Sequence, residues 1–185
     1  MTTDKQTRVA VLLGSTRAGS LNRRIAEHLR DNAPEGVTVE VLEGLDSVPF
    51  YSEEIDGETV PASAAALRQA VAAADRVLAV APEYNGTMPA VLNNAIDWLS
   101  RPYGQGAIVG KPFAAIGATP TPYGGKWSHE HARHSARIAG AAVVDGIVVD
   151  EPAVAGDPLA DDAARQRLVG ALEALVAVQP EGAVA

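Results

Sequence analysis

Five short, largely apolar runs, each followed by a polar loop, constrain the fold of this chain more than any other feature of its sequence. They span residues 8–13, 37–42, 76–81, 112–117 and 142–149. Strands that are apolar on both faces are typical of a parallel sheet with helices covering each side. Because crossovers between parallel strands are right-handed, these units predict an α/β fold that is three-layered and doubly wound.

Between these runs, apolar residues recur at the spacing of an amphipathic helix, as at Leu21, Ile25 and Leu29. The same pattern predicts helices after Pro61, after Pro89, and over about residues 127–140 and 161–178. The sequence shows no internal repeat and no linker. We therefore expect one domain over residues 1–185, with an ordered core over about residues 8–178.

Composition narrows the classes of partner. The chain has no cysteine, which excludes disulfides, thiolate metal sites and a cysteine nucleophile. Its net charge of −8, without any basic run, argues against a nucleic-acid partner. No apolar run approaches the roughly 20 residues of a membrane span, and the polar N-terminus does not resemble a secretory signal. We expect a cytoplasmic protein with no membrane partner.

The predicted topology locates a ligand site. Open α/β sheets bind ligands beyond the carboxyl ends of their strands, where the strand order reverses. In a five-stranded sheet of order 2-1-3-4-5, this point lies between the first and third strands. The loops after Leu13 and after Ala81 are therefore the segments in which binding residues are expected.

The loop after Leu13 has the composition of an anion-binding segment. This 14–22 loop carries hydroxyls at Ser15, Thr16 and Ser20, one cation at Arg17 and an amide at Asn22, and it opens onto a helix N-terminus. Unpaired N–H groups and the helix dipole favour a phosphate there. The segment matches neither a Walker A loop nor the GxGxxG fingerprint. The alternative interpretation is that Ser20 only caps the helix and Arg17 is a solvated charge.

The loop after Ala81 suits a flat ligand. This 82–89 loop contains Gly86, which permits a tight turn or a close backbone approach, and Tyr84 and Met88, which offer apolar contacts. Pro89 begins the next helix. The alternative interpretation is a plain connection from strand to helix with an Asn85–Gly86 turn.

The two loops together resemble the NADPH-dependent FMN reductase family, whose members are flavodoxin-like and include quinone, azo-dye and chromate reductases. The matching segments are residues 14–23, 82–86 and 92–99, with shorter similarities at 48–51, 110–112 and 124–125. They occur in family order over residues 9–149.

The resemblance implies a flavodoxin-like fold that binds FMN. It further implies that hydride passes from NADPH, or NADH, to flavin N5, and that electrons then pass to a small acceptor by ping-pong kinetics. The acceptor would be free flavin, a quinone, an azo compound or a metal oxyanion. The resemblance also implies a homodimer or homotetramer. The alternative function is a non-enzymatic electron carrier of the flavodoxin type, although an arginine in the phosphate loop is unusual for a flavodoxin.

The resemblance assigns the cofactor-binding residues in three groups. The FMN phosphate would be bound by the polar side chains of the 14–22 loop, the isoalloxazine ring would be lined mainly by backbone groups of the 82–89 loop, and a threonine would stand near the flavin. These residues are Ser15, Arg17, Ser20 and Asn22; Pro82, Glu83, Tyr84, Asn85 and Gly86; and Thr119. The N–H groups around residues 85–87 are expected to stabilise negative charge at the flavin N1–C2=O edge.

Several positions depart from the pattern of the family. Residues common in the family are replaced here by Asn93, Ala90, Thr121 and Pro122. Thr121 and Pro122 bear on nicotinamide preference and acceptor choice. Either Arg23 or Arg24 is a possible contact for a 2′-phosphate, with a solvated charge as the alternative.

The segment over residues 129–134 does not have the spacing of a metal site, although it contains His129, His131 and His134 together with Glu130. We expect no metal, no catalytic acid or base among the side chains, and a solvated or interface helix at this position.

Overall fold

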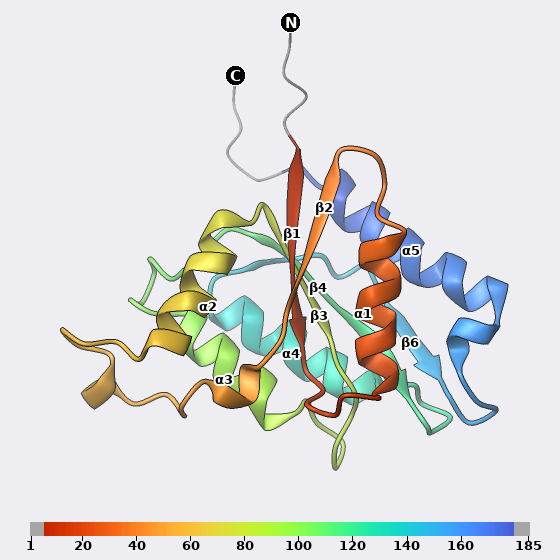
Figure 1. Cartoon of the computed structure of the whole chain (residues 1–185), viewed down its shortest axis with the longest axis horizontal. Coiled ribbons are helices and arrows are strands. Elements are labelled where there is room, and N and C mark those ends of the chain that lie inside the picture. The colour runs from red at the N-terminus through yellow and green to blue at the C-terminus, as the bar shows by residue number, and fades with distance from the viewer. Residues whose placement is uncertain (1–5, 180–185) are drawn as a thin grey trace, which may run out of the picture.

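The computed structural model describes residues 6–179, which form a parallel sheet with helices on both faces (Figure 1). The strand order is β2-β1-β3-β4-β5, and every strand pair is parallel. The first four strands are β1 (Thr7–Leu13), β2 (Val37–Leu42), β3 (Arg76–Val80) and β4 (Pro112–Thr119). This order confirms the predicted doubly wound fold. The ends of the expected domain, residues 1–5 and 180–185, lie outside the described residues.

The fifth strand position differs from the prediction. In place of one strand over residues 142–149, the chain forms β5 (Ala142–Val143) and β6 (Val149–Pro152), which pair with successive parts of β4. Between them the Ile147 N–H donates to the Val144 carbonyl, which closes a turn. Asp145 and Gly146, which are poor strand formers, lie in this turn. After the interruption, β6 pairs with the last four residues of β4, and Ala153, which follows β6, lines the site described below.

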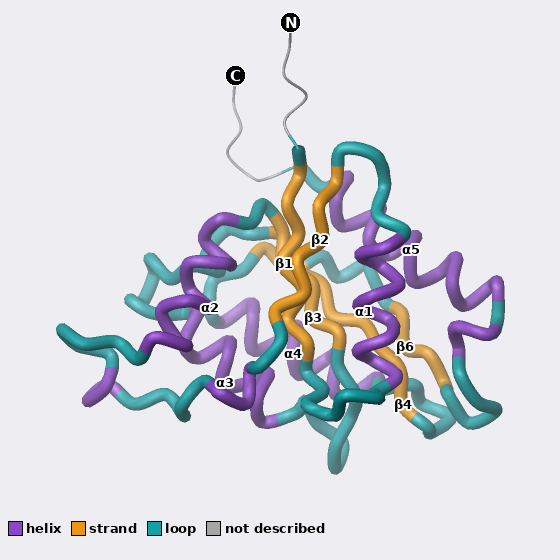
Figure 2. Tube along the Cα trace, viewed as in Figure 1, coloured by secondary structure: helices purple, strands orange, loops and turns teal. Residues whose placement is uncertain are grey.

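The helices divide between the two faces of the sheet (Figure 2). Helices α1 (Leu21–Asp31) and α5 (Asp162–Ala177) pack on one face, and α2 (Ala62–Ala73), α3 (Ala90–Leu99) and α4 (Lys126–Ile138) pack on the other. Short 3₁₀ helices at Leu45–Ser47, Glu53–Ile55 and Pro158–Ala160 lie in the connections. The positions of the five helices agree with the helical spacing in the sequence.

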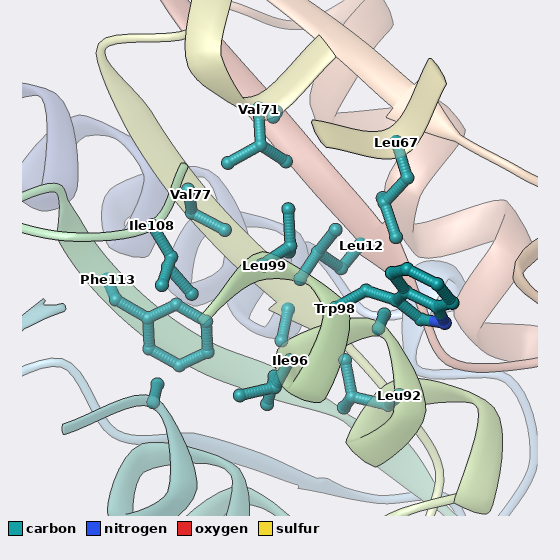
Figure 3. Close-up of a cluster of buried hydrophobic side chains, with 14 of the residues drawn as sticks. Leu12, Leu67, Val71, Val77, Leu92, Ile96, Trp98, Leu99, Ile108 and Phe113 are labelled. Carbon is teal, nitrogen blue, oxygen red and sulfur yellow. The ribbon is translucent and has the colours of Figure 1, made fainter. Parts of the chain in front are cut away.

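Alternation along the strands produces two separate cores. In β1, Ala10 and Leu12 face the α2–α3–α4 side, whereas Val9, Val11 and Leu13 face the α1–α5 side. Both sets are buried, which is why the strand is apolar throughout. The first core is built around large side chains that include Trp98 and Phe113 (Figure 3).

Candidate functional site

A cleft of about 790 Å³ opens beyond the carboxyl ends of β1, β3 and β4. It lies at the reversal of strand order, where the loops after β1 and β3 meet at the bottom of the view in Figure 1. Residues 118–121 at the end of β4 and just beyond it, and the segment with Ala153 and Gly156, complete its walls. Its volume is within the usual range for a cofactor pocket, roughly 300–1,000 Å³.

Most of the predicted site residues lie together in this cleft. The lining includes side chains from both loops and from the end of β4, namely Ser15, Arg17, Ser20, Asn22, Pro82, Glu83, Tyr84 and Thr119. The other two, Asn85 and Gly86, are exposed at the tip of the 82–89 loop and are not part of the lining. Two segments about 60 residues apart in sequence are therefore brought to one cavity, as the topology predicts.

The 14–22 loop presents several hydrogen-bond donors to the cleft. Among the described residues, the N–H groups of residues 15–19 have no hydrogen-bond acceptor. Arg17 is exposed at the cleft and forms no ion pair there with a described residue. Consecutive free N–H groups beside a helix N-terminus and a cation form an anion-binding arrangement.

Two residues of the same loop also have structural roles. The Ser20 hydroxyl accepts a hydrogen bond from the Arg23 N–H at 3.0 Å, so Ser20 is the N-cap of α1, as the alternative interpretation proposed. The Asn22 side chain is 3 % exposed and exchanges two hydrogen bonds of 2.9 Å with the backbone of Ala118. Asn22 thus fixes the start of α1 to the end of β4 and holds the loop in position.

The 82–89 loop is a tight two-residue hairpin. Tyr84 and Thr87 exchange backbone hydrogen bonds of 3.0 and 3.1 Å, while Asn85 and Gly86 have φ values of 52° and 72°. Positive φ at both central positions is the geometry that an Asn-Gly turn favours. The Thr87 N–H is therefore already engaged, which corrects its expected availability as a donor to a ligand. The N–H groups of Asn85 and Gly86 have no acceptor among the described residues.

Glu83 has a role that the sequence did not reveal. Its carboxylate accepts hydrogen bonds from the N–H groups of Trp127 and Ser128, at 3.0 and 3.3 Å, in the first turn of α4. The N-cap residue of that helix is Gly125, which has no side chain to form a capping hydrogen bond, so Glu83 caps the helix from another loop. The Glu83 N–H donates to the Thr119 Oγ1 at 3.1 Å. Loop, helix and strand end are connected through this one residue.

The prediction of a solvated or interface helix is wrong for His129. This side chain has no exposed area, and its nitrogens lie 2.5 Å from the Asp150 carboxylate and 2.9 Å from the Ala81 carbonyl. His131 and His134 are exposed. Within residues 6–179, no group of three or more possible metal ligands is found. The local sequence gives no signal for the burial of His129, because its closest partners are 21 and 48 residues away.

The two arginines considered for a 2′-phosphate are both paired. Arg23 forms an ion pair with Glu43, and Arg24 forms one with Asp157 at the rim of the cleft. Of the arginines lining the cleft, Arg17 alone has no carboxylate partner among the described residues. A charged ligand entering the cleft therefore meets Arg17 as the free cation.

Comparison of the chain with known proteins identifies its family. Residues 7–154 match the family described as NADPH-dependent FMN reductase. The chain belongs to that family. Over 127 residues it is 40 % identical to a quinone reductase of Pseudomonas putida, an overlap of 69 % of this chain and 68 % of the relative. It is also 40 % identical over 126 residues to a 2-hydroxy-1,4-benzoquinone reductase of a Burkholderia species, with 68 % of each chain covered.

A solved structure agrees with this membership of the FMN reductase family. FerB, a flavoenzyme NAD(P)H:(acceptor) oxidoreductase from Paracoccus denitrificans, superposes with a TM-score of 0.81 at 29 % sequence identity. The match covers 92 % of this chain and 95 % of FerB. The resemblance inferred from the two loops is confirmed by these findings.

This FMN reductase family member has a second cleft, of about 520 Å³, between α3 and α4. Its lining includes Thr87 of the 82–89 loop, His131 and the exposed Ile138. Burial raises the pKa of the Asp97 carboxyl in its wall.

Within the described residues, no helix is both long enough and apolar enough to cross a membrane.

Proposed function

We propose that this protein is an NAD(P)H-dependent reductase that binds FMN and passes electrons to a quinone or a similar small acceptor. The observation that carries the proposal lies in the wall of the large cleft, where the N–H groups of residues 15–19 and the Arg17 guanidinium have no partner among residues 6–179. These donors suit a phosphate monoester. The opposite wall is the 82–89 loop, which suits a flat ring system.

In this proposal each wall holds one end of FMN. The 14–22 loop binds the phosphate through Ser15, Arg17 and its backbone. The isoalloxazine ring lies against Pro82, Glu83, Tyr84 and the Asn85–Gly86 turn, with Thr119 beside it. When bound, FMN supplies the redox chemistry, because it accepts hydride from a nicotinamide and returns electrons to an acceptor. The protein supplies orientation and the donors around the ring.

The names of the relatives support a class of electron acceptor. Two curated relatives at 40 % identity are named for quinones, and FerB is named for a general acceptor. A quinone is small and planar enough to stack on an exposed flavin ring. We therefore propose a benzoquinone-type acceptor, with free flavin as the second candidate because the family is described by FMN reduction.

Anaerobic bleaching tests the proposal. Protein reconstituted with FMN and desalted is mixed with NADPH or NADH, and the visible flavin absorbance is followed; a benzoquinone is then added. We expect the nicotinamide alone to bleach the flavin within seconds to minutes and the quinone to restore the colour. A flavin that stays oxidised until a separate reductase is added would contradict the proposal and support the electron-carrier alternative.

We also propose that the protein is a homodimer. The support is the second cleft between α3 and α4, which is bordered by the exposed side chains of Tyr103 and Ile138. Light scattering after size-exclusion chromatography is expected to give twice the mass of one chain, and Ile138→Asp is expected to shift it toward the monomer. A wild-type mass equal to one chain at micromolar concentration would contradict the dimer.

A further inference from the structure

The first turn of α4 contacts three consecutive residues, Ala81 and the first two residues of the 82–89 loop. His129 hydrogen-bonds the Ala81 carbonyl, the Ser128 hydroxyl donates to the Pro82 carbonyl at 2.8 Å, and the N–H groups of Trp127 and Ser128 donate to Glu83. The path of the chain as it leaves β3 is therefore set by α4 rather than by the hairpin itself. His129 and Ser128 are both fully buried.

The partners of His129 determine how its imidazole is used. The Ala81 carbonyl only accepts hydrogen bonds, so Nε2 carries the proton and donates to it at 2.9 Å. Nδ1 lies 2.5 Å from Oδ1 of Asp150 on β6, with a proton between the two atoms. Asp150 thereby fixes the ring orientation that aims Nε2 at Ala81. The side chain connects the end of β3 to β6 through the interior.

Two glycines leave the space that the imidazole occupies. A Cβ atom at Gly117 would lie 3.0 Å from His129 Nε2 and 2.3 Å from the Ala81 oxygen. One at Gly125 would lie 2.9 Å from His129 Cε1. Contacts below about 3.4 Å between such atoms are repulsive, so any side chain at either position would displace the ring or the carbonyl. Gly117 thus leaves space for the Ala81 oxygen and the imidazole, and Gly125 leaves space for the imidazole.

We propose that His129 is a positioning residue for the flavin ring: its Nε2–H holds the Ala81 carbonyl and so fixes the wall formed by the 82–89 loop, while Asp150 orients the imidazole. This inference rests on the proposed function, because it assigns that wall to the isoalloxazine ring. The competing account is that His129 only ties α4 to β6, with Asp150 as its important partner. In the first account flavin binding depends on the bond from Nε2 to Ala81, whereas in the second the important bond is the one between Nδ1 and Asp150.

Two amide substitutions separate the nitrogens. In His129→Gln the side-chain amide reaches the position of Nε2 and keeps the bond to Ala81, whereas in His129→Asn it reaches the position of Nδ1 and keeps the bond to Asp150. The probe is riboflavin, which has the ring without the phosphate, and its dissociation constant is measured by fluorescence quenching with the apo-protein. We expect about tenfold weaker binding for His129→Asn, since a buried carbonyl loses its donor, and a change within about twofold for His129→Gln.

A second variant covers the case in which His129→Asn does not fold. Asp150→Ala removes the group that orients the imidazole and leaves His129 in place. We expect riboflavin to bind about threefold to fivefold more weakly and the hairpin amide of Thr87 to exchange hydrogen faster in the apo-protein. An Asp150→Ala protein with unchanged affinity and unchanged exchange would overturn the inference.

The outcomes also separate this inference from the proposed function. If wild-type protein binds neither FMN nor riboflavin, the flavin assignment itself fails. If wild-type protein binds both, but His129→Gln weakens riboflavin as much as His129→Asn or more, or neither variant changes it, the positioning role is wrong. Arg17→Ala provides the matched control, since it is expected to weaken FMN and leave riboflavin unchanged.

Discussion

The two walls of the cleft are built in opposite ways. The 14–22 loop leaves its donors free, with the N–H groups of residues 15–19 and Arg17 lacking acceptors among the described residues. The start of the 82–89 loop is held by α4 and Thr119 through Glu83 and by His129 through Ala81. The 14–22 loop thus has free donors that can hydrogen-bond a ligand. The 82–89 loop is instead preorganised by hydrogen bonds within the protein. Affinity is expected to depend on the first wall, and ring orientation on the second.

The largest effect is expected where the two walls meet. Gly117→Ala would place a Cβ atom 2.3 Å from the Ala81 oxygen and 2.6 Å from the Asn22 Oδ1, so it would displace both walls at once. We expect the free energy of unfolding to fall by about 3 kcal/mol or more, and the melting temperature by about 10 °C. Gly146→Ala is the control, because its Cβ atom would meet nothing within 4 Å. Equal melting temperatures for the two variants would contradict the contact.

The free wall is tested by Arg17→Ala. Loss of a charge-assisted hydrogen bond to the phosphate is expected to cost about 1.5–3 kcal/mol, which raises the dissociation constant for FMN by about 10- to 150-fold. The melting temperature of the apo-protein should not change, since Arg17 has no partner among the described residues. Arg30→Ala makes the same change of charge at the far end of α1 and should leave FMN binding unaltered. Unchanged flavin affinity in Arg17→Ala would remove the phosphate role.

An ion pair outside the cleft should contribute to the stability of the fold without changing the affinity for flavin, in contrast to the two walls. Asp56 and Arg68 form two hydrogen bonds, of 2.6 and 2.7 Å, and these bonds hold the pKa of Asp56 below its ordinary value. The pair therefore stabilises the fold above a pH of about 3.9, the unfolded-state pKa, and loses this contribution as the pH falls through the lower folded-state pKa. We expect Asp56→Asn to cost about 1–2 kcal/mol at pH 7.

The measurement for this pair is denaturant unfolding of wild type and Asp56→Asn as a function of pH. The difference in free energy of unfolding should shrink toward zero in acid, and FMN affinity at pH 7 should be the same in both proteins. Asp31→Asn, in the more exposed pair with Arg30, should show no measurable loss. A difference that grows in acid would contradict the assigned sign of the pKa shift.

The smallest effect is expected at the preorganised wall. Thr119→Val keeps the shape of the side chain but removes the Oγ1 acceptor of the Glu83 N–H. One hydrogen bond of this kind contributes about 1 kcal/mol, so riboflavin and FMN should both bind about fivefold more weakly. Thr119→Ser retains the hydroxyl and should restore most of the affinity. A loss confined to FMN would place Thr119 at the phosphate instead of the ring.

The sequence predicted the parts of this molecule that depend on local pattern and general topology. Apolar runs located β1 to β4, and the rule for ligand sites in open sheets predicted that Ser15 and Pro82 lie in one cavity. The Asn85–Gly86 turn was also predictable from the sequence, since few dipeptides favour positive φ at two successive residues.

The remaining features depend on contacts between distant segments. The capping of α4 by Glu83 and the burial of His129 join residues that are 44 to 48 positions apart, and nothing near either residue indicates the partner. The split of the fifth strand was missed for a different reason. The run over residues 142–149 is apolar enough to satisfy a strand pattern, while the turn at Asp145 and Gly146 occupies only its middle.

Titration of the apo-protein with FMN and with riboflavin, in parallel, tests the central claim most directly. We expect one flavin per chain in both cases, with FMN bound at least about 100-fold more tightly, because only FMN completes the free donors of the 14–22 loop. Equal affinities for the two flavins, or no binding of either, would contradict the assignment of this cleft.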